Sequence, residues 1–304
     1  MQAPDFGIGG DPPTVGSALR EWTAQLARCG VEGGGSDVRR LLAAALDIPA
    51  ARVLSEPERV LTPAELATLT LYVVRRARRE PVSRILGRRD FYGRTFMISP
   101  ATLDPRPESE TLIEAAIGLV RKEGWAQSDL RILDVGTGSG CLLLTLLAEL
   151  DGASGTGTDV SEAALAVARV NAGHLGVADR ASWLAANALE TVPGPFHILV
   201  SNPPYVRSDD IAQLAPEVCN FDPAIALDGG VDGLAVYQRL APTVASVVPD
   251  GWVVMEIGYD QADAVASILA DGIGRESLGD LRVYHDVAGE RRCVAVRTRT
   301  GARA

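Results

Sequence analysis

The spacing of apolar residues predicts helices near the start of the chain. Apolar side chains recur every three or four positions, the repeat of an amphipathic helix, at residues 14–31, 36–47 and 62–80. The third stretch has a helix-start signature, with Thr62 as N-cap, Pro63 at the first helical position and Glu65 completing a capping box. Pro81 cannot continue that helix. We therefore predict a small helical domain over residues 14–85.

From residue 111 onward, short apolar runs alternate with helical stretches. Five runs have the length of buried strands, at residues 131–136, 155–160, 180–186, 196–202 and 251–258. Such alternation predicts an α/β fold with a mostly parallel sheet and helices on both faces. Two last runs, 281–287 and 291–298, are joined by three residues and predict an antiparallel hairpin at the sheet edge. We assign this domain to residues 111–304.

Two segments lie outside these domains. Residues 86–110 combine short strand-like pieces with glycines and prolines, which predicts a connector that contains a hairpin. Residues 1–13 are rich in Pro and Gly and lack the apolar core of a signal peptide, so we expect a disordered leader.

Composition narrows the classes of function. The chain of 304 residues is 47% hydrophobic and carries a net charge of −10, which argues against a surface built to neutralise phosphates. The four cysteines and three histidines are scattered, so we expect no disulfide framework, no metal site and a cytoplasmic location. The longest apolar run is too short to span a membrane.

One basic stretch departs from the acidic average. Seven arginines lie within residues 75–89, namely Arg75, Arg76, Arg78, Arg79, Arg84, Arg88 and Arg89. Two interpretations stay open: a solvated helix face paired with nearby acids, or a docking surface for a partner.

A glycine-rich turn follows the run at 131–136. Gly136, Gly138 and Gly140 occupy alternate positions, and a helical stretch begins directly after them. Glycines there allow a tight turn, close approach of a ligand to the backbone and a helix that starts near the strand. The spacing differs from the G-x-G-x-x-G of dinucleotide folds and lacks the G-K-[ST] ending of a phosphate-binding loop. An ordinary strand-to-helix turn would also fit.

Two polar residues follow the next two strand runs. Asp159 lies 19 residues after Gly140, where an acid can accept hydrogen bonds from two ribose hydroxyls. It could instead cap the following helix, although Ser161 can do that. The turn and the acid together imply a ligand that contains a nucleoside. Asn187 could contact an adenine or simply be a turn residue.

The sequence "SNPPYV", residues 201–206, directly follows an apolar strand run. Consecutive prolines end a core strand and hold Asn202 and Pro203 extended. The Asn202 side-chain oxygen and the Pro203 carbonyl then form a stiff pair of acceptors, beside Pro204 and the flat ring of Tyr205. Two acceptors suit a planar –NH2 group, whose nitrogen they can orient and whose developing positive charge they can stabilise during methyl transfer. A strand-terminating turn is the alternative for the tetrapeptide alone.

These motifs carry a family resemblance. "DVGTGSG", "GTDVS" and "SNPPYV" resemble class I S-adenosylmethionine-dependent methyltransferases of the N-P-P-Y type, which have a Rossmann-like fold. The segments "EPVSRILGRRDFYG", "ISPATLDPRPESE", "FDPAIALDGGVDGL" and "DVAGERRCVAV", with the helical domain, resemble the peptide chain release factor glutamine methyltransferases (the PrmC/HemK family). The resemblance covers about residues 15–298.

The resemblance implies a specific reaction. Members methylate the glutamine of the G-G-Q motif in bacterial class I release factors and produce N5-methylglutamine. It implies S-adenosylmethionine over Gly136, Thr137, Gly138, Ser139 and Gly140, its ribose on Asp159, and Asn187 and Asn202 as further cofactor-binding residues. It also implies that Asn202 and the Pro203 carbonyl hold the glutamine amide with Tyr205 beside it. We expect a monomer that uses no metal.

Two rival functions remain at this stage. An adenine-N6 methyltransferase acting on DNA or RNA would use the same Asn-Pro-Pro-Tyr chemistry, with a flipped base stacked on Tyr205. The acidic charge and the lack of a basic target-recognition domain argue against it. A non-catalytic adaptor that binds S-adenosylmethionine would have no chemical need for the acceptor array.

Overall fold

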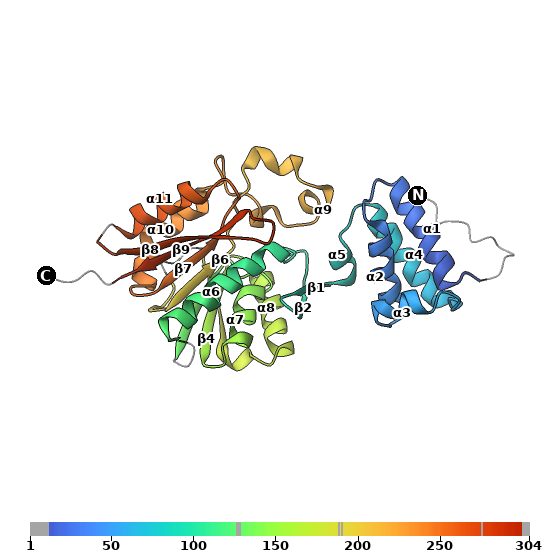
Figure 1. The fold of residues 1–304 in the computed structure, drawn as a ribbon, viewed down its shortest axis with the longest axis horizontal. Helices are drawn as coiled ribbons and strands as arrows, with labels where there is room; N and C mark the ends of the chain where they lie inside the picture. Colours follow the sequence, from blue (N-terminus) through green and yellow to red (C-terminus); the bar gives the residue numbers. More distant parts are fainter. Residues whose placement is uncertain (1–11, 126–128, 188, 190, 275, 300–304) are drawn as a thin grey trace. The chain divides into compact units, whose positions relative to one another are not determined.

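The computed structural model describes residues 12–125, 129–187, 189, 191–274 and 276–299. The chain forms two compact units, which are coloured along the sequence in Figure 1. The helical unit contains the described residues up to Gly87 together with Pro216–Phe221, and the sheet unit contains the rest. Apart from Pro12 and Pro13, the predicted leader lies outside the described residues.

The helical unit is built from short amphipathic helices around one core. Its helices are α1 (Val15–Arg28), α2 (Gly34–Ala45), α3 (Ala50–Ser55), α4 (Pro63–Ala77), α5 (Val82–Leu86) and α9 (Pro216–Cys219). Trp22, Leu41 and Leu69 are among its fully buried side chains. The predicted capping box at α4 is present: the Glu65 N–H donates to Thr62 Oγ1 (3.3 Å), and the Thr62 N–H donates to Glu65 Oε2 (2.8 Å).

Ion pairs fix the segment Pro216–Phe221 to the helical unit. Arg76 is only 7% exposed and donates to Asp37 (2.7 Å) and to Glu217 (3.0 Å). Arg79 donates two hydrogen bonds to Glu217 (2.7 and 2.8 Å), and Arg75 donates to Glu80 (2.8 Å). Arg75, Arg76 and Arg79 therefore fit the first interpretation of the arginine stretch, which is pairing with nearby acids. Arg76 is also too buried to contact a partner protein.

The sheet unit contains a seven-stranded sheet with the order β5-β4-β3-β6-β7-β9-β8. Its strands are β3 (Leu130–Val135), β4 (Ala153–Asp159), β5 (Ala181–Ala185), β6 (Ile198–Ser201), β7 (Trp252–Glu256), β8 (Leu278–His285) and β9 (Arg291–Thr298). The first five are parallel, whereas β9 pairs antiparallel with β7 and with β8. This confirms the predicted parallel sheet with an antiparallel hairpin at its edge.

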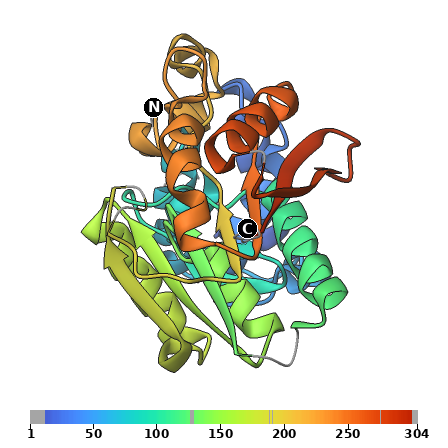
Figure 2. The same ribbon diagram turned by 90° about the vertical axis from the view of Figure 1, so that its left-hand side faces the viewer.

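Helices cover both faces of this sheet (Figure 1 and Figure 2). On one face lie α6 (Glu110–Glu123), α7 (Cys141–Glu149) and α8 (Glu162–His174); on the other lie α10 (Ala235–Val247) and α11 (Ala262–Ile273). The strands alternate between two cores, as a period of two requires. Val200 and Val254 pack with α6 and α7, while Leu199 packs with α10 and α11.

The predicted connector 86–110 contains a two-stranded hairpin. Its hairpin, β1 (Arg88–Phe91) and β2 (Arg94–Met97), belongs to the sheet unit. Asn171 of α8 accepts a hydrogen bond from the Met97 N–H (2.8 Å) and donates one to the Met97 carbonyl (2.9 Å). The Tyr92 N–H donates to Glu110 at the start of α6 (2.8 Å). These bonds attach the hairpin to helices that the sequence places far apart.

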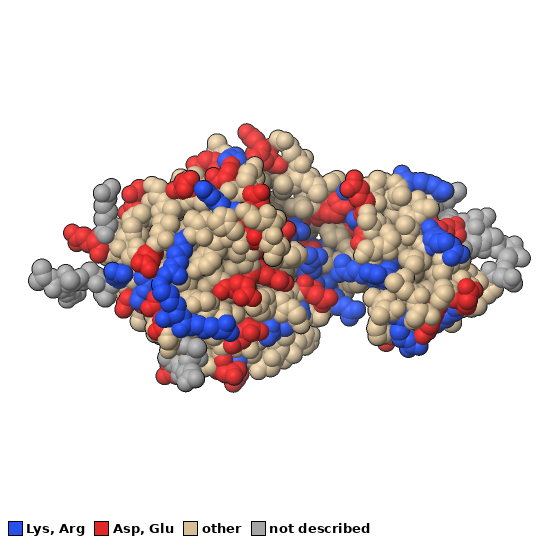
Figure 3. Space-filling model, in the orientation of Figure 1, with Lys and Arg blue, Asp and Glu red and all other residues tan. Residues whose placement is uncertain are grey.

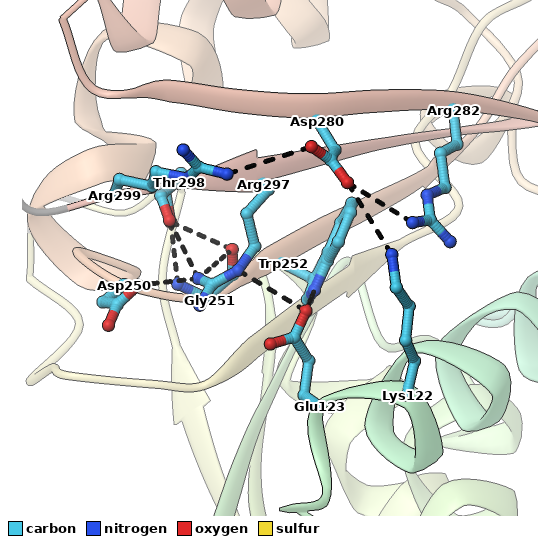
Figure 4. Close-up of polar contacts among 10 residues, drawn as sticks. All are labelled: Lys122, Glu123, Asp250, Gly251, Trp252, Asp280, Arg282, Arg297, Thr298 and Arg299. Carbon is cyan, nitrogen blue, oxygen red and sulfur yellow. Dashed lines mark hydrogen bonds and ion pairs between the residues drawn. The ribbon is translucent and has the colours of Figure 1, made fainter.

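Polar contacts fasten the C-terminal hairpin at the end of the sheet where β7 begins (Figure 4). Glu123 of α6 accepts from the Trp252 indole N–H (3.0 Å), and Arg297 lies 2.9 Å from Asp250. These contacts lie at the amino end of β7. In the part of the chain that the structure describes, no helix combines the length and the apolar character needed to cross a membrane.

Candidate active site

The glycine turn connects β3 to α7 in a conformation that requires glycine. Gly136, Gly138 and Gly140 all have positive φ, at 72°, 56° and 81°, which side chains rarely adopt. A Cβ on Gly140 would lie 2.9 Å from Leu144 Cδ1 and 3.2 Å from Ala168 Cβ, so Gly140 allows α7 to start against α8. A Cβ on Gly136 would meet nothing within 4 Å, so the loop leaves open space in front of it.

Asp159 holds this loop from the end of β4. Its Oδ2 accepts from the Gly138 N–H (2.9 Å) and its Oδ1 from the Ser161 N–H (2.9 Å). The N-cap of α8 is Ser161, whose Oγ accepts from the Ala164 N–H (3.2 Å). Asp159 is therefore not the cap, and each of its oxygens retains a lone pair for a further hydrogen bond.

A buried carboxyl that sequence reasoning missed lies under the loop. Asp134 of β3 accepts from Thr137 Oγ1 (2.6 Å) and from the Leu143 N–H of α7 (3.3 Å). Burial raises its pKa to about 7, against hydrogen bonds from Thr137 and Leu143 that lower it. The sequence could have revealed Asp134, because an acid inside an apolar strand run is buried and needs a hydrogen-bond partner. Asp134 links the loop to α7.

A cavity of about 430 Å³ opens in front of the loop, within the size range of ligand sites. It lies at the carboxyl ends of β3, β4, β5 and β6, where ligands bind in open α/β sheets. Eight predicted residues line it: Gly136, Thr137, Gly138, Ser139, Asp159, Asn187, Asn202 and Pro204. Gly140, Pro203 and Tyr205 are not among these lining residues, but each is next to one in the chain. Unpredicted lining residues include Arg106, Ser109 and Arg239.

Asn187 lies at the rim of this cavity after β5. Its Oδ1 accepts a hydrogen bond from Arg239 of α10 (3.0 Å). The side chain is thus held in place, and contact with an adenine stays a prediction.

The segment Asn202–Tyr205 continues β6 into the cavity wall. The Asn202 amide donates from Nδ2 to Ser109 Oγ (3.2 Å), which leaves Oδ1 as the free end of the amide. The loop of residues 229–233 supports the segment closely, because a Cβ on Gly229 would lie 2.8 Å from the Pro204 carbonyl oxygen. The acceptor that sequence reasoning assigned to Asn202 is therefore available.

Tyr205 ends this segment, and its place beside the substrate amide stays a prediction. It packs partly against the core under α10 and α11, and its hydroxyl donates to Glu256 Oε1 at the end of β7 (3.2 Å). Burial raises the pKa of Tyr205 far above its usual range, and Glu256 adds to this rise. These contacts hold Tyr205 in place next to Pro204, which lines the cavity.

Comparison with known proteins places this geometry in a family. The PrmC N-terminal domain family matches residues 17–87, and the methyltransferase small domain family matches residues 119–219. The release factor glutamine methyltransferase of Rhodospirillum rubrum is 43% identical over 286 residues, which cover 94% of this chain and 85% of that protein. The enzyme of the same name from Cereibacter sphaeroides is 42% identical over 92% of this chain and 97% of its own length. The chain belongs to the release factor glutamine methyltransferase family.

The fold of this methyltransferase is shared more widely. The hMettl16 catalytic domain, in complex with MAT2A 3'UTR hairpin 6, matches 66% of this chain and 74% of its own with a TM-score of 0.53. At 16% identity this likeness shows the fold alone. A methyltransferase domain of this kind implies S-adenosylmethionine as the methyl donor.

The family decides between the alternatives that the sequence left open. Its named members are release factor glutamine methyltransferases, which supports neither an adenine-N6 methyltransferase nor a non-catalytic adaptor. On the face drawn in Figure 3, Lys and Arg are interspersed with Asp and Glu, whereas nucleic-acid binding favours a clustered basic surface. Among the described residues, no group of three or more His, Cys, Asp or Glu could hold a metal.

Proposed function

We propose that this methyltransferase transfers a methyl group to the side-chain amide nitrogen of the glutamine in the G-G-Q motif of bacterial class I release factors. The product is N5-methylglutamine. Release factors act in translation termination, so the reaction takes place in the cytoplasm. The observation that supports this most directly is Asn202, whose Oδ1 is free because its Nδ2 is bound to Ser109 at the cavity wall.

The cavity residues fit S-adenosylmethionine. Gly136 and Gly138 leave space in front of the loop, where the backbone admits a ligand closely. Asp159 retains hydrogen-bonding capacity for the two ribose hydroxyls. Val160, Ala186 and Leu240 give the cavity apolar walls that suit an adenine ring. When bound, S-adenosylmethionine supplies an electrophilic methyl carbon attached to a positively charged sulfur.

The protein's part in the reaction is to orient a weak nucleophile. The lone pair of an amide nitrogen is delocalised, so the nitrogen reacts only when it is held in line with the methyl carbon. Asn202 Oδ1 and the Pro203 carbonyl accept the two N–H hydrogens and fix that orientation, a positioning effect of about 7–11 kcal/mol at most. As the new N–C bond formed and the C–S bond of the donor broke, the nitrogen would carry positive charge, which both oxygens would stabilise until the nitrogen gave one proton to solvent.

The helical unit has a separate role in this proposal. Methylation of a small amide does not require residues 14–85, so we assign them to recognition of the body of the release factor. Two arginines of the basic stretch, Arg78 and Arg88, are exposed. If this role is correct, a short peptide that contains G-G-Q will be a much poorer substrate than the intact factor. Equal specificity constants for both would leave the helical unit a structural role.

One assay tests the reaction itself. The protein is incubated with radiolabelled S-adenosylmethionine and one of four acceptors: a release factor, the same factor with G-G-Q changed to G-G-A, DNA or RNA. Label should enter only the unchanged release factor. Label in DNA or RNA would favour the adenine-N6 alternative, and no transfer to any acceptor would favour the adaptor.

A further inference from the structure

Behind Asn202 lies a buried polar group that the proposed chemistry does not use. Strands β6 and β7 pair in parallel with Ser201 opposite Met255, so Asn202 and Glu256 are opposite each other one residue further on. Val200 and Val254 both face α6, and strand alternation directs Asn202 and Glu256 to that same face. There they meet Ser109, the residue that directly precedes α6.

Two hydrogen bonds join these residues in pairs, and the influence of the Ser109 hydroxyl on the Glu256 carboxyl links the two pairs into one chain. Asn202 Nδ2 donates to Ser109 Oγ (3.2 Å) and the Tyr205 hydroxyl donates to Glu256 Oε1 (3.2 Å). The Ser109 hydroxyl lies close enough to the Glu256 carboxyl to lower the pKa of that group. Ser109 and Glu256 are 2% and 1% exposed, and Glu256 Oε2 has no hydrogen-bond partner among the described residues. A buried carboxylate therefore faces two hydroxyls.

The charge on Glu256 sets the direction of this chain. An ionised carboxylate can only accept hydrogen bonds, so the Ser109 hydroxyl directs its proton toward Glu256. Ser109 Oγ then has only lone pairs to offer Asn202, and these bind Nδ2. The other end of the amide, Oδ1, consequently faces the cavity.

Protonation would remove that constraint. A neutral Glu256 is itself a donor, and Ser109 is then free to donate to Asn202. The Asn202 amide can accept that bond only after turning by half a rotation, which directs Nδ2 into the cavity. There it would oppose the –NH2 group of the glutamine, donor against donor.

We propose that Ser109 and Glu256 are positioning residues: ionised Glu256, acting through Ser109, keeps the oxygen of Asn202 directed at the substrate amide. This inference rests on the proposed function and extends it to two residues that do not touch the acceptor.

The electrostatic surroundings place the ionisation of Glu256 near neutral pH. Burial raises its pKa to about 7, while Ser109, Tyr205 and Arg292 act to lower it and Glu108 acts to raise it. The titratable and charged groups that face Glu256 are Glu108, Cys141, Tyr205, Tyr237, Arg292 and Cys293. The pKa values of the two tyrosines and two cysteines are raised, so these four stay protonated at neutral pH.

The test measures kcat against pH with an intact release factor and saturating radiolabelled S-adenosylmethionine. Wild-type kcat should rise with pH through an apparent pKa near 7, because the active form needs ionised Glu256. Glu256→Gln should lower kcat and abolish this rise. Ser109→Ala should lower kcat about 10- to 100-fold, the scale on which outer partners of a site residue act in metal centres. Affinity for S-adenosylmethionine should stay unchanged in Glu256→Gln, because Glu256 is not among the residues that line the cavity.

Two comparisons make the role specific. Asp134→Asn removes the other buried carboxyl with a pKa near 7, and it should keep the pH-dependent rise. Ser109→Ala in an Asn202→Ala background should cause no further loss, because Ser109 acts only through Asn202. Thermal unfolding of each variant detects a folding defect.

Each outcome decides one question. Persistence of the pH-dependent rise in Glu256→Gln, or an equal loss from Ser109→Ala with and without Asn202, would overturn the positioning role. If Glu256→Gln does not fold, the Ser109→Ala comparison alone decides. A wild-type protein that does not methylate the release factor would instead refute the proposed function, so the two failures are distinguishable.

Discussion

Replacement of Asp159 by Ala tests how the protein holds the methyl donor. The carboxylate accepts from the Gly138 and Ser161 N–H groups, both at 2.9 Å, and in our proposal its remaining lone pairs bind the ribose hydroxyls. Hydrogen bonds to a charged group contribute about 1.5–3 kcal/mol. The dissociation constant for S-adenosylmethionine should therefore rise about 10- to 150-fold, measured by isothermal titration calorimetry.

A matched variant separates ligand binding from loop stability. Asp286 also accepts from two backbone N–H groups, those of Ala288 (2.9 Å) and Glu290 (3.0 Å), but it does not line the cavity. Asp286→Ala should lower the unfolding temperature while the dissociation constant stays unchanged. If Asp159→Ala binds S-adenosylmethionine as tightly as wild type, the ribose does not bind at Asp159 and the reasoning is refuted.

Glu217→Gln tests the helical unit, and Gly140→Ala, with Gly138→Ala as its control, tests the glycine turn. Burial acts to raise the pKa of Glu217, but hydrogen bonds from Arg79 and Arg76 outweigh it and lower the pKa to about 2. A lowered carboxyl pKa stabilises the fold above the unfolded pKa near 4.5, and this effect is lost as pH falls toward 2. Because solvent screens a partly exposed ion pair, Glu217→Gln should lower the free energy of unfolding by about 1–2 kcal/mol in urea unfolding at pH 7. The difference should shrink below pH 4.5, and a difference independent of pH would contradict this. In Gly140→Ala, the new Cβ would combine a strained φ of 81° with close contacts to Leu144 and Ala168. Urea unfolding should therefore show a loss in the free energy of unfolding larger than the ~1–2 kcal/mol that the backbone conformation alone costs. Gly138→Ala, whose Cβ would have only a distant contact, should show a loss near that value.

The parallel sheet and the edge of it that faces the ligand follow from local sequence patterns. Apolar runs of strand length, separated by helices, allow few arrangements of a parallel sheet. Gly136, Gly138 and Gly140 mark the turn because no other residue type adopts positive φ so readily. Asn202 follows directly because the prolines end the strand at the same edge.

The supporting residues could not be predicted in this way, because they depend on contacts between distant parts of the chain. Ser109 is 93 positions before Asn202, and Glu256 meets Tyr205 from a strand 51 positions later. Separations of this length leave no periodic pattern in the sequence from which the contacts could be predicted. The segment Pro216–Phe221 joins the helical unit through ion pairs across 138 and 141 positions. In contrast, α6 (Glu110–Glu123) could have been predicted, because its apolar residues have helical spacing. We assigned no helix there, since we considered only the helices that follow the first parallel strand.

The central claim is that Asn202 holds the glutamine amide for methyl transfer. The direct measurement is the single-turnover rate of transfer to an intact release factor for wild type and Asn202→Ala, with tandem mass spectrometry locating the added methyl group. We predict that wild type methylates the side-chain nitrogen of the G-G-Q glutamine. Asn202→Ala should lose about 10²- to 10³-fold in rate while its affinity for S-adenosylmethionine is retained. A near-normal rate in Asn202→Ala, or a methyl group on any other residue of the factor, would contradict the account.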